Sequence, residues 1–171
     1  MLHRIGVDIN KSINYLHEFN AGSAQHSLHS PTVHGSAEMN YWLVKSDPGE
    51  YGWEDLVKER KTHWTGVRNY AARLHMNGMK KGDAVLFYHS NREPAVIGEA
   101  MVTREAFPDP TSQDDKWVAV ELEARKTLAS PVSLQRIKAE KRLAEIGLVR
   151  IGRLSVMPLR KPEYGRYVGI T

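Results

Sequence analysis

From residue 39 onward, hydrophobic and polar positions follow short periods that suit strands and short helices. Apolar runs or alternations bounded by turn residues predict strands at 41–45, 84–89, 95–102, 117–125, 154–159 and 167–170. Helical spacing predicts helices at 53–60 and 70–76, a helix capped by Ser133, and a further turn or helix that ends at Gly147. Because strands dominate and helices do not alternate with them regularly, we predict an α+β fold, a small mixed β-barrel with attached short helices.

The first 38 residues have a different character from the rest of the chain. Apolar positions from Leu2 to Leu16 fit one weak amphipathic helix, and residues 21–38 are rich in Ser, Gly and His. His26 and His29 have a spacing that suits a metal ion, but no third ligand is evident near them. We therefore predict a poorly ordered N-terminal extension, residues 1–38, followed by one domain, residues 39–171.

Composition narrows the class of protein. The chain has 171 residues, 41% hydrophobic and 26% charged, which suits one globular domain. No apolar run approaches the roughly 20 residues that cross a bilayer. The absence of cysteine excludes disulfides, thiolate nucleophiles and cysteine-held metal sites. Without a secretory signal at its start, the protein is expected in the cytoplasm of a bacterium, or in the nucleus if its source is eukaryotic.

Familiar catalytic and cofactor motifs are missing. Residues 147–152 have the glycine spacing of a phosphate-binding loop but lack its Lys and Ser/Thr, and no nucleophile elbow, zinc-protease helix or dinucleotide fingerprint occurs. We interpret Asp109, Asp114 and Asp115 as a solvated acidic loop, because a calcium loop needs a Gly and a terminal Glu that are absent. We expect no metal, no cofactor and no catalytic residue; an enzyme that uses His63 or His89 beside an acid stays an alternative.

The four tryptophans fall between positions 42 and 117. Trp42 and Trp117 lie within predicted strands, so we assign them to the core. Trp53 and Trp64 lie beside loops, next to polar Ser-Asp-Pro and Arg-Asn segments. A flat ligand needs an aromatic platform with hydrogen-bonding groups at its edge, and these segments supply both.

Four motifs occur in a defined order: KSDP at 45–48, WTGVRNYAAR at 64–73, GD followed by FYHS within 82–90, and RLSV at 153–156. Together they resemble the EVE domain family, from about residue 39 to the C-terminus. The resemblance implies a PUA-like fold, related to YTH readers of methylated adenine and similar to SRA-type readers of methylated cytosine. It also implies a non-catalytic module that holds a modified base of DNA or RNA in an aromatic and polar pocket.

Transferred to this chain, the resemblance implies a base-binding pocket drawn from each motif. Its residues are Ser46, Asp47, Pro48, Trp53, Trp64, Val67, Arg68, Asn69, Tyr88, His89, Ser90, Leu154 and Ser155. The tryptophans would stack on the base, and Asp47 would accept from an exocyclic amino group. Each polar residue also has a structural alternative: a turn at Ser46 and Asp47, a helix cap at Asn69, an ion pair at Arg68, and a satisfied histidine at position 89.

Basic residues point to a polyanionic partner. Residues 39–171 contain 22 basic and 17 acidic side chains, and residues 146–162 contain no acid. We predict a phosphate-binding rim made of Lys45, Arg73, Arg150, Arg153, Arg160 and Lys161. Scattered, solvated charge is the alternative. The expected partner is nucleic acid, with no membrane and no obligate protein partner; an RNA-binding adaptor without modification preference and an enzyme acting on a nucleobase or nucleotide stay open.

Overall fold

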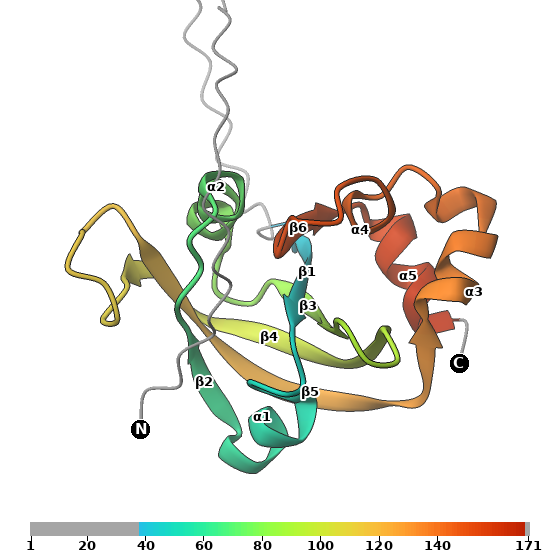
Figure 1. Ribbon diagram of the computed structural model, residues 1–171, viewed down its shortest axis with the longest axis horizontal. Coiled ribbons are helices and arrows are strands. Elements are labelled where there is room, and N and C mark those ends of the chain that lie inside the picture. Colours follow the sequence, from blue (N-terminus) through green and yellow to red (C-terminus); the bar gives the residue numbers. More distant parts are fainter. Residues whose placement is uncertain (1–37, 170–171) are drawn as a thin grey trace, which may run out of the picture.

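The structure is a computed structural model that describes residues 38–169, so the predicted extension with His26 and His29 lies outside the described residues. One six-stranded sheet is flanked by short helices (Figure 1). The strands are β1 (Tyr41–Ser46), β2 (Lys61–Trp64), β3 (Ala84–His89), β4 (Ala95–Pro108), β5 (Val118–Ser133) and β6 (Val156–Leu159). The helices are α1 (Trp53–Glu59), α2 (Tyr70–Gly78), α3 (Leu134–Ala139), the 3-10 turn η1 (Lys141–Leu143), α4 (Gly147–Arg150) and α5 (Lys161–Gly169).

The order of the strands places two chain segments side by side at one end of the sheet. The order is β2-β5-β4-β3-β1-β6, in which β1 and β3 are parallel and the other pairs are antiparallel. The register of the parallel pair runs from Tyr41 opposite Ala84 to Ser46 opposite His89. Because parallel strands end at the same edge, the turns that follow Ser46 and His89 are neighbours.

The sheet is open, so the predicted α+β class is confirmed and the predicted barrel is wrong. Among the described residues, the four-residue strands β2 and β6 form the two edges and pair only with β5 and β1. Helix α2 packs against the edge strand β6 and also against β4 and β5. Register shifts bend the long β4–β5 pair, but this curvature does not bring the two edges together.

The core lies between the sheet and the surrounding helices. Val85, Leu86 and Phe87 are fully buried, and the mostly apolar run of β3 is typical of a strand that is covered on both faces. The strand predicted at 167–170 is wrong, since residues up to 169 belong to α5 and Tyr167 is fully buried there. A short apolar run does not distinguish a buried helix from a strand. Within residues 38–169, no helix is both long and apolar enough to cross a membrane.

Candidate nucleic-acid interface

Three of the four sequence motifs meet where β1 and β3 end. The Lys45 amide donates to the Ser155 carbonyl at 2.8 Å, which joins the end of β1 to the segment that enters β6. The amide and hydroxyl of Ser90 donate to the Ser46 carbonyl at 2.8 and 3.0 Å. These bonds bring together most of the predicted pocket, and we call this group the strand-end site. It comprises Ser46, Asp47, Pro48, Tyr88, His89, Ser90, Asn91, Leu154 and Ser155.

Two neighbouring polar residues of this site differ in whether they can still bind a ligand. Ser46 is 1% exposed, and its hydroxyl donates to the Tyr51 carbonyl at 2.6 Å, so it shapes the turn. Asp47 is partly exposed; one carboxylate oxygen accepts from the Gly49 amide at 2.9 Å and the other from the Asn91 side-chain amide. A carboxylate offers about four acceptor positions, so Asp47 can still accept hydrogen bonds from a ligand.

Asn91 is a member of the site that the sequence analysis missed. Its φ is 65°, a left-handed conformation that Asn adopts more readily than most residues. In this conformation its side chain reaches back to Asp47 across the ends of β1 and β3. The available sequence signal was an Asn directly after the FYHS motif, at the start of a predicted loop.

His89 has a structural role, which was the alternative to a base contact at this position. Its Nε2 accepts from the backbone amide of Trp53 at 2.9 Å, which fixes the first residue of α1 on the end of β3. An accepting Nε2 carries no proton, and burial lowers the pKa of His89 although Glu54 and Asp47 oppose that shift. A second sequence candidate, His63, lies exposed on β2 with Nε2 3.5 Å from a Glu121 carboxylate oxygen.

The His89 contact predicts a loss of stability in acid. Protonated His89 cannot accept the Trp53 bond, and its folded-state pKa lies below the ordinary 6.5, so the unfolded chain gains protons first as the pH falls. The melting temperature should therefore decrease between about pH 7.5 and about pH 5. His89→Gln keeps an acceptor that does not titrate and should flatten part of this slope. Equal slopes in the parent and in His89→Gln would contradict this role.

Both tryptophans predicted to stack on a base lie in the core. Trp53 is 2% exposed and Trp64 is 0% exposed. Phe87 packs edge-on against both rings, with centroids 5.4 and 5.5 Å away. The Trp53 indole N–H donates to the Thr127 hydroxyl at 2.9 Å, whereas that of Trp64 has no hydrogen-bond partner among the described residues. Since their faces are covered, a base reaches either ring only if core side chains move.

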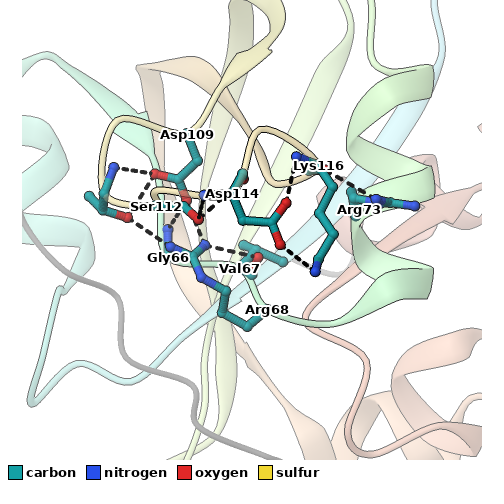
Figure 2. Close-up of polar contacts among 9 residues, drawn as sticks. Gly66, Val67, Arg68, Arg73, Asp109, Ser112, Asp114 and Lys116 are labelled. Carbon is teal, nitrogen blue, oxygen red and sulfur yellow. Dashed lines mark hydrogen bonds and ion pairs between the residues drawn. The ribbon is translucent and has the colours of Figure 1, made fainter.

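The remaining motif is fixed on the loop between β4 and β5. Asp109 is 3% exposed and accepts from the Gly66 amide at 2.9 Å, from the Arg68 guanidinium at 2.6 Å, and from Thr111 (Figure 2). Burial alone would raise the pKa of Asp109, but the bonds from Arg68, Thr111 and Gly66 outweigh it and lower the pKa. The solvated-loop interpretation is therefore wrong for Asp109.

The same segment resolves two alternatives left open by the sequence. Arg68 forms an ion pair with Asp109 at 2.6 Å. Asn69 caps α2, because its side-chain oxygen accepts from the Ala72 amide at 3.0 Å. Val67, between the β2 end and this cap, is 5% exposed. Helix α2 begins directly after Asn69, so its first turn borders these predicted pocket residues.

The residues of the predicted phosphate-binding rim do not lie together, because some are at one end of the β1–β6 pair and others at the opposite end. The Lys45 ammonium donates to the Gly152 carbonyl at 2.6 Å, and the neighbouring Arg153 is exposed, so both flank the strand-end site. Burial lowers the pKa of Lys45. Arg160 and Lys161 follow the end of β6 that pairs with the start of β1, roughly 16 Å along the strands from that site.

Acidic residues just outside the acid-free segment pair with two of its arginines. Arg150 forms an ion pair with Glu145, and Arg160 lies 2.7 Å from a Glu163 carboxylate oxygen. Arg73 lies instead on α2, where its guanidinium donates to the Lys116 carbonyl at 3.1 Å. Among the residues that the structure describes, no three His, Asp or Glu side chains are grouped as a metal site would require.

Comparisons with known proteins agree with the sequence resemblance. The model of the EVE domain matches residues 40–168. Thymocyte nuclear protein 1 of Rattus norvegicus is 32% identical over 76% of this chain and 73% of its own length. A solved structure from Agrobacterium tumefaciens is 42% identical, covering 77% of this chain and 92% of that one, with a TM-score of 0.75. The human THYN1 protein in complex with 5-methylcytosine containing DNA is 30% identical, covering 77% and 96%, with a TM-score of 0.71.

Proposed function

The chain belongs to the EVE domain family, and we propose that it is a non-catalytic DNA-binding module that recognises a modified base such as 5-methylcytosine. The observation that carries the proposal is the likeness to the human THYN1 protein solved with 5-methylcytosine containing DNA, of which the match covers 96%. The meeting of three family motifs at the strand-end site supports the same proposal, because a base reader needs several polar groups aimed at one place.

We assign the base to the strand-end site, with Asp47 as its main polar contact. The Asp47 carboxylate would accept from the exocyclic amino group of cytosine, a pairing that suits an acidic side chain. Leu154, which is 6% exposed, would offer apolar surface to a methyl group. Burial of one methyl contributes about 0.8 kcal/mol, which gives a several-fold preference over the unmodified base.

The neighbouring elements would complete the contact with DNA. Lys45 and Arg153 lie on the flank of the site and would bind phosphate oxygens of the same strand. Trp53 and Trp64, 2% and 0% exposed, would support the site from the core without stacking on the base. Taking a base out of a duplex costs a few kcal/mol, so these contacts together must exceed that amount.

A binding panel tests the proposal. Short single- and double-stranded DNAs with cytosine, 5-methylcytosine, 5-hydroxymethylcytosine or methylated adenine, and matching RNAs, are titrated at about 0.1 and 0.3 M salt. We expect tighter binding to one modified DNA, with a preference that persists at the higher salt because base contacts release few counterions. Equal affinity for all strands with a steep salt dependence would overturn the reader, and equal affinity confined to RNA would favour an RNA-binding adaptor.

Asp47→Asn provides a residue-level prediction. The variant keeps the shape of the side chain but replaces one acceptor oxygen by a donor, which would face the donors of Asn91 or of the base amino group. Affinity for 5-methylcytosine DNA should fall about tenfold, in line with roughly 1–3 kcal/mol for one base contact. Glu105→Gln, which removes an equal charge from an exposed ion pair with Lys80, is the control and should not lose affinity. Similar affinities of the two variants would refute the contact.

A further inference from the structure

The outer face of α2 exposes large side chains that the strand-end site does not use. Tyr70 is 58% exposed and Leu74 is 63% exposed. Residues four apart lie on the same side of a helix, so these two form one apolar strip at the first turns of α2. Exposed apolar groups that adjoin one another mark a surface that binds a partner.

The end of the β4–β5 loop adds a third large side chain to this strip. Trp117 was predicted to lie in the core, but it precedes the first residue of β5 and is partly exposed. Its ring lies 5.1 Å from the ring of Tyr70, centroid to centroid, at a tilt of 43°. The other three tryptophans are no more than 7% exposed, so Trp117 alone presents an indole at the surface.

Cations are interleaved with these rings. The Arg68 and Arg73 guanidinium carbons lie 5.6 and 5.9 Å from the Trp117 centroid, and the Lys116 ammonium lies 5.5 Å from it. Arg73 also lies 5.1 Å from the Tyr70 centroid. We call this group the α2 surface; its residues are Arg68, Tyr70, Arg73, Leu74, Lys116 and Trp117, and Figure 2 shows Arg73 on the helix facing the loop that carries Lys116.

Arg73 is the cation of this surface that is available to an anion. Arg68 pairs with Asp109 and Lys116 pairs with Asp114. Arg73 forms no ion pair among the described residues: one terminal nitrogen donates to the Lys116 carbonyl at 3.1 Å, and its Nε is buried without a hydrogen-bond partner there. The side chain as a whole is partly exposed, and a guanidinium without an acidic partner, held between aromatic rings, suits a phosphate oxygen.

We propose that the α2 surface binds the unpaired nucleotides that flank the recognised base, with a base stacked on Tyr70 and Trp117 and a phosphate at Arg73. Aromatic faces interleaved with cations fit this occupant, because every base has a flat face and every linkage carries a negative charge. The surface shares Arg68 with the predicted pocket, and Tyr70 directly follows the pocket residue Asn69 in the chain, so one strand can extend from these pocket residues onto the surface. That this strand carries the recognised base rests on the proposed function, whereas the stacking of a base on Tyr70 and Trp117 does not.

Affinity for an unmodified single-stranded DNA is the direct test. Tyr70→Ala should weaken binding about tenfold, since one stacked base is worth roughly 5- to 150-fold in affinity, whereas Tyr70→Phe keeps the ring and should bind as the parent does. Val57→Ala, which shortens an exposed side chain on α1, is the matched control and should leave affinity unchanged. Parent-like affinity of folded Tyr70→Ala would overturn the proposal.

Fluorescence provides a second readout that does not depend on the Tyr70 variant. Because Trp117 is the one partly exposed indole among the described residues, stacking should quench its emission when single-stranded DNA is added. Trp117→Phe should abolish that quenching, and no quenching in the parent would contradict the proposal. Loss of affinity in Tyr70→Ala together with an absent preference for modified DNA in the parent would refute the base reader and leave the α2 surface intact.

Discussion

Replacing Gly98 by alanine is expected to destabilise the domain by about 3 kcal/mol or more, at the upper end of what overpacking costs. A Cβ at this position would lie 2.3 Å from Cζ2 of Trp53, well inside any real contact. The indole cannot move aside easily, since Thr127 binds its N–H and Phe87 packs against its face. Gly98 also lies at a register shift between β4 and β5, where a glycine lets the ring approach the backbone.

Urea unfolding of Gly98→Ala and of a matched glycine variant measures this effect. Gly165→Ala is the control, because a Cβ there meets nothing within 4 Å and alanine is the better helix former inside α5. We expect Gly165→Ala to be as stable as the parent or more stable. A change below about 1 kcal/mol in Gly98→Ala would show that Trp53 is packed loosely, which would favour a ring that moves toward a ligand.

Local sequence signals predicted the parts of the fold that local physics determines. The apolar run of β3, the Asn69 cap of α2 and the Ser133 cap of α3 were each foreseen, because a cap or a buried strand depends on adjacent residues. Whether the sheet closes depends instead on which distant strands pair. The barrel was therefore wrong: α2 lies beside β6, and no pattern within 70–78 reveals that position.

The tryptophans illustrate the same limit at the candidate site. Proximity to a loop suggested a ligand contact for Trp53 and Trp64, but both rings turn inward onto Phe87. The location of Trp117 within a predicted strand suggested a core position, but its neighbours are the cations of a loop and of α2. The direction in which a ring at the end of an element points depends on tertiary packing, which periodicity does not encode.

Asp109→Ala is expected to destabilise the domain by about 2–3 kcal/mol, since it removes a buried carboxylate with charge-assisted bonds. The Gly66 amide would lose its acceptor and Arg68 its ion-pair partner, so the segment leading into α2 would separate from the β4–β5 loop. Asp115→Asn, an exposed neighbour in that loop, is the control and should change stability by less than about 0.5 kcal/mol.

The pH dependence of stability shows whether the charge of Asp109 stabilises the domain or only the packing of its side chain does. The pKa of Asp109 is lower in the folded protein than its ordinary 3.8, so its contribution is fully present above that value and is lost as the pH falls through the folded-state pKa. Asp109→Asn keeps the size and one acceptor, so it should lose less stability than Asp109→Ala and should flatten the acid limb of the stability curve. If stability decreased with falling pH in Asp109→Asn as steeply as in the parent, another group would cause the acid sensitivity. The ion pair between Asp109 and Arg68 would then not contribute to it.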